Sequence, residues 1–163
     1  MIINIILNNK SKFWILVLCL FIGLIGYYLL PETNLKIGQK ADKIIINKAN
    51  HELLLYENED LIATYKVSLG RKGLGKKTIL GDNLTPEGRF LGKKRGQSEF
   101  YKAISIGEWG ECCGVLIHGQ KYSWVGKFQR WMDWTEGCIA LTNNEMDEIY
   151  AAVSDGVIIE INP

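Results

Sequence analysis

The sequence has almost no net charge, which limits the partners it can attract. Its 163 residues include 19 basic and 18 acidic side chains, a formal charge of +1. Without an excess of positive charge, no broad electrostatic field draws the chain to nucleic acid, so we expect no nucleic-acid partner. A chain of this length has room for one domain and an appendage, which argues against a two-domain enzyme.

Histidine and cysteine are also scarce, with two and four residues respectively. Any Cys/His catalytic pair must therefore come from a very small set. His51 lies in a predicted hairpin turn, where an exposed histidine is the ordinary interpretation. Cys19 lies in an apolar run and is interpreted as an apolar filler of that run. His118 is left as the candidate base.

One segment, residues 13–30, lacks charge altogether. A helix of this length spans about 27 Å, close to the hydrocarbon core of a bilayer. A cleaved signal peptide is the alternative, but no small-x-small cleavage pattern follows the run. We therefore predict an uncleaved transmembrane anchor. Lysines within residues 1–12 indicate a cytoplasmic N-tail and place residues 31–163 in the periplasm or another extracytoplasmic space.

Beyond the anchor, the pattern predicts a spacer over residues 31–42 and one domain over 43–163. Three apolar runs separated by Asn, Glu and Asp indicate a β-meander, and two further strands are expected, one in the middle of the remaining sequence and one at the end of the chain. The runs are 44–46, 53–56 and 61–68, and the further strands are 114–118 and 156–161. Residues 143–154 predict an amphipathic helix capped by Asn143. The expected fold class is mostly β with one or two helices.

Residues 70–100 carry many glycines and basic side chains. They predict a long loop-rich stretch with at most short strands, and loops of this length are usually functional or mobile.

Cys138 lies in the segment Thr135-Glu136-Gly137-Cys138, just before the predicted helix. A free thiol with a pKa of about 8.5 is only slightly ionised at neutral pH, so a cysteine nucleophile needs a nearby base. Gly137 permits a tight turn that exposes the sulfur, and backbone N–H groups around such a turn can form an oxyanion hole. Cys138 is therefore the candidate nucleophile.

The order of these motifs resembles the L,D-transpeptidase catalytic domain family, also called YkuD. His118-Gly119 is followed, after residues 120–134, by Thr135-x-Gly137-Cys138 and an aliphatic residue. The segment 85–90 (TPEGRF) resembles a motif that precedes the histidine in this family. Residues 133–140 are similar to a DWTxGCIA variant of the signature, and the resemblance covers about residues 41–162.

The resemblance implies a β-sandwich-like domain that acts on peptidoglycan stem peptides. Cys138 would attack the third stem residue, expel the terminal D-alanine and hold a thioester. His118 would be the base, and the Gly119 carbonyl would orient its imidazole. The acceptor would be an amine of a second stem, giving a 3→3 cross-link, or of an anchored lipoprotein. Neither a metal nor an organic cofactor is implied.

Two positions depart from the commoner form of the family signature. Glu136 replaces a histidine, and Ala140 replaces an arginine or asparagine. The Glu136 carboxylate would raise the pKa of a nearby thiol or orient a cationic acceptor. A hydrolytic carboxypeptidase or endopeptidase of the same fold is therefore the nearest alternative. A non-catalytic wall-binding homologue is a second alternative, and a sortase is a weaker one.

Aromatic residues crowd the stretch between His118 and Cys138. Trp124 and Trp134 are candidate substrate-binding residues together with Thr135, Glu136 and Gly137, although core packing also accounts for such rings. The basic side chains of the same stretch are Lys121, Lys127 and Arg130, and they suit either a stem carboxylate or solvent.

Cys112 and Cys113 form a vicinal pair. They have three interpretations: a vicinal disulfide, a disulfide of one of them with Cys138 that would switch the enzyme off, or buried free thiols.

Overall fold

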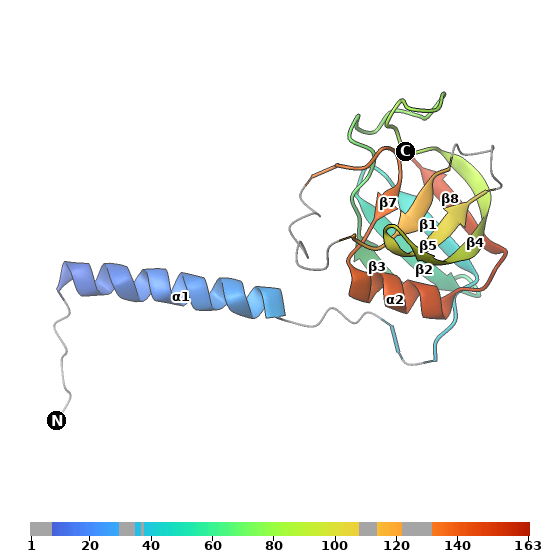
Figure 1. Cartoon of the computed structure of the whole chain (residues 1–163). Coiled ribbons are helices and arrows are strands. Elements are labelled where there is room, and N and C mark those ends of the chain that lie inside the picture. Colours follow the sequence, from blue (N-terminus) through green and yellow to red (C-terminus); the bar gives the residue numbers. More distant parts are fainter. Residues whose placement is uncertain (1–7, 30–34, 37, 108–113, 122–131) are drawn as a thin grey trace. The chain divides into compact units, whose positions relative to one another are not determined.

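The computed structural model describes residues 8–29, 35–36, 38–107, 114–121 and 132–163 (Figure 1). The chain divides into two compact units, Met1–Pro31 and Glu32–Pro163. The first unit contains one helix, and the second contains a β-sheet with a shorter helix.

Helix α1 runs over Asn9–Leu29. At about 1.5 Å per residue it is about 31 Å long, which matches the hydrocarbon thickness of a bilayer. In the part of the chain that the structure describes, it is the one helix long and apolar enough to cross a membrane, and its segment Lys10–Tyr27 has a mean hydropathy of 1.6. N-terminal signal sequences share this length and composition. The structure therefore shows an apolar N-terminal helix of the kind that serves as a span or a signal.

Eight strands form one sheet in the described part of the second unit, in the order β3-β2-β1-β8-β4-β5-β6-β7. β1 pairs in parallel with β8 and β6 pairs in parallel with β7, while the other neighbours are antiparallel. The strands are β1 (Lys43–Asn47), β2 (Glu52–Glu57), β3 (Asp60–Lys66), β4 (Gly88–Ser98), β5 (Tyr101–Ile106), β6 (Leu116–His118), β7 (Ile139–Ala140) and β8 (Val157–Asn162). Figure 1 shows the sheet curving around its own interior, which gives a half-barrel.

The three predicted apolar runs at the start of the domain form β1, β2 and β3, an antiparallel meander as expected. Alternate side chains of β1 and β2 are buried, because successive residues of a strand point to opposite faces of the sheet. The predicted closing strand forms β8 and lies between β1 and β4. The predicted fold class, mostly β with one or two helices, is therefore confirmed.

The prediction of at most short strands in residues 70–100 is wrong. β4 covers Gly88–Ser98, 11 residues, and pairs with both β8 and β5. Its glycines obscure the apolar alternation that would otherwise mark a strand. Gly92 is needed for packing: a Cβ there would lie 2.7 Å from Val157 Cγ1 and 2.8 Å from Ile159 Cδ1.

Helix α2 runs over Asn143–Ala152, and its cap differs from the predicted one. The cap residue is Thr142, not Asn143, because the Thr142 hydroxyl accepts from the Glu145 N–H while the Glu145 carboxylate accepts from the Thr142 N–H. The Asn143 side chain instead accepts the Gln120 N–H at 2.7 Å. It therefore holds the segment just after His118.

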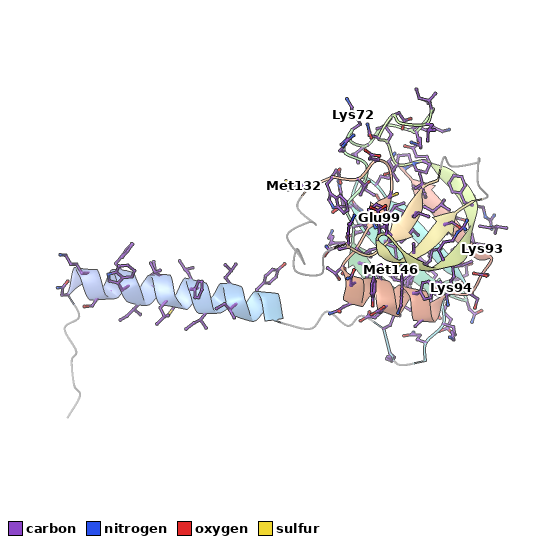
Figure 2. All side chains as sticks on the ribbon, in the orientation of Figure 1. Lys72, Lys93, Lys94, Glu99, Met132 and Met146 are labelled. Carbon is purple, nitrogen blue, oxygen red and sulfur yellow. The ribbon has the colours of Figure 1, made fainter. Side chains whose placement is uncertain are left out.

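The core lies between the concave face of the sheet and α2, which runs along it in Figure 1. Met146 and Ile149 of α2 are fully buried against strand residues, and Met146 is labelled in Figure 2. Tyr65 is 1% exposed, and its hydroxyl donates to Glu148 Oε2 at 2.8 Å. Burial, together with the Glu148 carboxylate, raises the pKa of Tyr65 well above its usual range.

Backbone pairing joins the segment after β3 to the other end of the sheet. Ser68 bridges Ala140 and Gly70 bridges Thr135. The Ser68 N–H donates to the Ala140 carbonyl at 3.0 Å, and the Ala140 N–H returns a bond at 2.9 Å. This pairing brings the start of the loop between β3 and β4 beside the strand that follows Cys138.

Lys48 fixes the far end of the same loop from inside the domain. Its side chain is fully buried, and its Nζ donates to Glu87 Oε1 at 2.6 Å. It also donates to the carbonyls of Gly75 at 3.0 Å and Thr85 at 3.2 Å. A buried ammonium with three acceptors holds the loop in one path, because a broken bond would leave charge unpaired.

We expect Gly92→Ala to destabilise the domain by about 1–3 kcal/mol, because the added methyl overpacks the contact with β8. Gly96→Ala in the same strand is the matched control, since a Cβ there meets nothing within 4 Å. Thermal unfolding of the full chain in mild detergent, followed by near-UV circular dichroism, measures both variants. Equal melting temperatures for the two would contradict the packing argument.

Candidate active site

His118 and Cys138 are brought together by the parallel pairing of β6 and β7. In this register Ile117 lies opposite Ile139, and His118 lies opposite Ala140. Both isoleucines are fully buried in the core. Because side chains alternate along a strand, His118 and Cys138 lie on the opposite face from these isoleucines.

The turn before β7 is held by one hydroxyl. Thr135 Oγ1 accepts the Gly137 N–H at 3.1 Å and donates to the Cys138 carbonyl at 2.7 Å. Gly137 has φ of +119°, and a Cβ there would lie 2.6 Å from the Leu84 carbonyl oxygen. The turn therefore requires both the glycine and the buried threonine.

The His118 ring is fixed by its own neighbour. Its Nδ1 lies 2.6 Å from the Gly119 carbonyl oxygen. A carbonyl only accepts, so Nδ1 carries the hydrogen and the neutral ring keeps its lone pair on Nε2. The ring packs against Phe100, with centroids 4.6 Å apart, and edge-on against Trp134 at 6.0 Å. This burial lowers the pKa of His118, although the Gly119 carbonyl opposes the shift.

The Cys138 thiol is a free thiol in a largely buried position. Burial raises its pKa, while the Leu116 N–H and the charge of Lys77 act in the opposite direction. Glu136 raises the pKa further, as the sequence suggested. A raised thiol pKa and a lowered imidazole pKa together favour a neutral resting pair over a thiolate–imidazolium ion pair.

Glu136 has a partner that the sequence did not reveal. Its Oε1 lies 3.3 Å from Arg71 Nη2, and both side chains are more than half exposed. Arg71 Nη2 also donates to Asn83 Oδ1 at 3.2 Å. The carboxylate two residues before Cys138 is therefore partly balanced by a cation from the loop after β3.

A pocket of about 560 Å³ opens at these residues. Cys138 and His118 line it together with cationic, aromatic and turn residues from distant parts of the chain. The lining residues are Arg71, Lys77, Leu80, Gly81, Phe100, Gly114, Val115, His118, Trp134, Thr135, Glu136 and Cys138. Thr135, Glu136 and Trp134 thus lie where the sequence predicted a site, whereas Trp124 lies outside the described residues.

The sequence analysis missed Lys77 and Asp82. Lys77 Nζ donates to Asp82 Oδ1 at 2.7 Å, and the two side chains are only 5% and 11% exposed. Burial opposes ionisation of Asp82, but hydrogen bonds from Lys77 and three backbone N–H groups lower the pKa of its carboxyl well below its usual range. The available signal was the glycine- and lysine-rich composition of the loop, which marked a functional segment but no single residue.

His51 is not the plainly exposed turn histidine that the sequence predicted. Its Nε2 lies 3.0 Å from Asp133 Oδ2, and its side chain is 36% exposed. The other oxygen of Asp133 accepts the Leu69 N–H at 2.8 Å. The histidine thus supports the chain just before Trp134, a tertiary contact that a local turn pattern cannot reveal.

Of the remaining candidates from the sequence, the structure describes Lys121 but not the other five. Lys121 Nζ lies 2.8 Å from Glu99 Oε1 in an exposed pair, and this contact lowers the pKa of Glu99. The others lie outside the described residues, namely Cys112, Cys113, Trp124, Lys127 and Arg130.

Comparison with known proteins assigns the family. The model of the L,D-transpeptidase catalytic domain, YkuD, matches residues 41–161. YafK of Escherichia coli (strain K12), which is named as an L,D-transpeptidase, is 33% identical over 131 residues, covering 71% of this chain and 48% of YafK. The chain therefore belongs to the L,D-transpeptidase catalytic domain family, as its motifs suggested. It spans about half the length of this curated relative.

Solved structures show the same fold at lower identity. An L,D-transpeptidase from Mycobacterium smegmatis aligns with a TM-score of 0.57 and 19% identity, covering 76% of this chain and 59% of that one. The helical cell shape determining protein Pgp2 from Campylobacter jejuni aligns with a TM-score of 0.57 and 22% identity, covering 81% and 52%.

We expect Thr135→Val to destabilise the domain by about 1–3 kcal/mol, because it leaves the Gly137 N–H and the Cys138 carbonyl without their partner. Thr135→Ser keeps the hydroxyl and should melt close to wild type. Thermal unfolding of the full chain compares the two. A valine variant that melts close to wild type would contradict the role of the hydroxyl, because valine keeps the methyl group and loses only the oxygen.

We expect alkylation of Cys138 by iodoacetamide to rise with pH along a curve whose midpoint lies above that of an ordinary thiol, because burial disfavours the thiolate. Glu136→Gln should move the midpoint down, since it removes a carboxylate that raises the pKa. Mass spectrometry of the Cys138 peptide measures the rate separately from other cysteines. Glu59→Gln, also highly exposed but in the β2–β3 turn, is the control and should leave the midpoint unchanged.

Proposed function

We propose that this chain is a peptidoglycan L,D-transpeptidase in which Cys138 is the nucleophile and His118 the base. Family membership supports an enzyme of this kind acting on peptidoglycan peptides. The observation that carries the assignment of roles is the 2.6 Å contact between His118 Nδ1 and the Gly119 carbonyl. It leaves Nε2 as the basic nitrogen of a ring that lines the same pocket as Cys138.

In the first half-reaction, the thiol proton of Cys138 passes to His118 Nε2 as the sulfur attacks the carbonyl carbon of the third stem residue. The carbon–nitrogen bond to the terminal D-alanine then breaks, and the leaving amine takes the proton from the imidazolium. A thioester on Cys138 remains. The lowered pKa of His118 and the raised pKa of Cys138 favour a neutral resting pair, which transfers the proton during the attack.

In the second half-reaction, an amine attacks the thioester carbon and gives its proton to His118 Nε2. The carbon–sulfur bond breaks, and the imidazolium returns the proton to the Cys138 sulfur. The acceptor amine belongs to a second stem or to an anchored lipoprotein. The exposed Glu136 carboxylate at the pocket rim supports an amine over water as acceptor, since an ammonium group can exchange with Arg71 as its partner.

The N-terminal helix supports a location at the membrane. We propose residues 13–30 as an anchor, 1–12 as a cytoplasmic tail, 31–42 as a spacer and 43–163 as an extracytoplasmic catalytic domain. Stem peptides lie outside the cytoplasmic membrane, so this arrangement keeps the pocket in the compartment of its substrate.

Acylation of Cys138 tests the proposed function directly. We expect the full chain in detergent to gain the mass of one carbapenem on incubation. The Cys138 sulfur would attack the β-lactam carbonyl, open the ring and remain acylated as a thioester. Cys138→Ala should gain none, and Cys19→Ala should react as wild type does. Intact mass spectrometry measures the adduct. An equal adduct on Cys138→Ala would overturn the assignment.

A tetrapeptide-stem muropeptide extends the same test to the reaction. We expect loss of D-alanine and accumulation of cross-linked dimers when an acceptor stem is present. Shortened monomeric stems without dimers would identify the hydrolytic alternative instead.

A further inference from the structure

Lys77 is a buried cation whose hydrogen-bonding capacity is only partly used. Its side chain is 5% exposed and lines the pocket of Cys138. An ammonium group has three N–H donors. Among the described residues, the one acceptor of Lys77 is Asp82 Oδ1 at 2.7 Å. Two of its donors therefore have no acceptor among the described residues and are available to a ligand in the pocket.

The position of Lys77 is set by the loop, not by its own flexible stem. Asp82 accepts from the N–H groups of Thr78, Ile79 and Leu84 as well as from Lys77. The same loop is tied to the domain interior through Lys48, which donates to the Gly75 carbonyl. The ammonium is therefore preorganised, and little conformational entropy is lost when it binds an anion.

Lys77 also lies close to the nucleophile. Its Nζ is 3.5 Å from the position that a Cβ on Gly137 would occupy, and Gly137 directly precedes Cys138. One residue of extended peptide spans at most about 3.3–3.6 Å. A group one residue beyond a carbonyl held at Cys138 is thus within the range of this ammonium.

We infer that Lys77 determines the specificity for the acyl donor by binding the free carboxylate of the single residue that is expelled. The inference rests on the proposed function. A leaving residue with a free carboxylate places two anionic oxygens one residue past the scissile bond, where Lys77 has donors to offer. An additional residue, or an amidated terminus, removes that anion from this position.

Arg71 is less suited to this role than Lys77. Its Nη2 already donates to Asn83 and Glu136, and its side chain is 52% exposed. A solvated guanidinium with two partners discriminates weakly between a charged and a neutral terminus. The ammonium of Lys77 discriminates more strongly, because its side chain is only 5% exposed and a charge-assisted hydrogen bond to a carboxylate is stronger than one to a neutral carboxamide.

The test compares two donors that differ in one group: a tetrapeptide stem with a free terminal carboxylate and the same stem with a terminal carboxamide. The rate of thioester formation on the full chain at low donor concentration gives kcat/KM for each. We expect wild type to favour the acid by about 10- to 100-fold, the range typical of a hydrogen bond to a charged group. Lys77→Gln should bring the ratio close to one, mainly by losing activity on the acid.

Lys76→Gln is the matched control, because Lys76 is exposed, lies in the same loop and does not line the pocket. It should keep the wild-type ratio. The ratio also separates recognition of the carboxylate from an effect of Lys77 on the thiol, since a change in thiol reactivity lowers both rates by the same factor.

Three outcomes overturn the inference. If wild type has nearly equal kcat/KM values for the acid and the carboxamide donors, the inference is wrong, whether or not the Lys77→Gln variant folds. A Lys77→Gln variant that loses both activities equally and keeps the ratio assigns Lys77 to the thiol or the turn. If the wild type forms no thioester with either donor, the proposed function fails, and the inference fails with it.

Discussion

The site depends on the backbone pairing between residues 68–71 and 135–140. Ser68 exchanges two hydrogen bonds with Ala140, and Thr135 donates its N–H to the Leu69 carbonyl while its own carbonyl accepts the Arg71 N–H. These bonds are short-range and directional, so they fix the turn before Cys138 relative to the loop after β3. The two segments are far apart in sequence, and without the pairing Cys138 would lack its cationic neighbours.

This pairing sets the electrostatic balance of the pocket. The ring contacts of His118 and the burial of Cys138 favour neutral groups, whereas Lys77 brings a positive charge to the same pocket. Asp82 and Glu136 each neutralise part of the positive charge without filling every donor. The pKa shifts favour a neutral Cys/His pair, and the cations of the pocket keep donors free for the carboxylate of the proposed substrate.

Much of the fold was predictable because its elements have clear local patterns. The meander of β1, β2 and β3 consists of three short apolar runs separated by clear turn residues, and β8 is another apolar run. β4 was missed because Gly92 occupies a position where a side chain would collide with β8, and a glycine in sequence looks like a loop. The cap of α2 was misplaced by one residue because Thr142 and Asn143 are both good cap residues, and only the contact of Asn143 with Gln120 separates them.

The sequence by itself determined the family and the residues that form the proposed catalytic pair, since His118-Gly119 and Gly137-Cys138 are local motifs in a fixed order. Their chemistry depends on residue type and on contacts with adjacent residues, such as the Gly119 carbonyl on His118. Only the tertiary structure decided which charges face the thiol. Lys77 reaches the site through the closure of the sheet, and the energy of a charge depends on burial and partners that lie far from it in sequence.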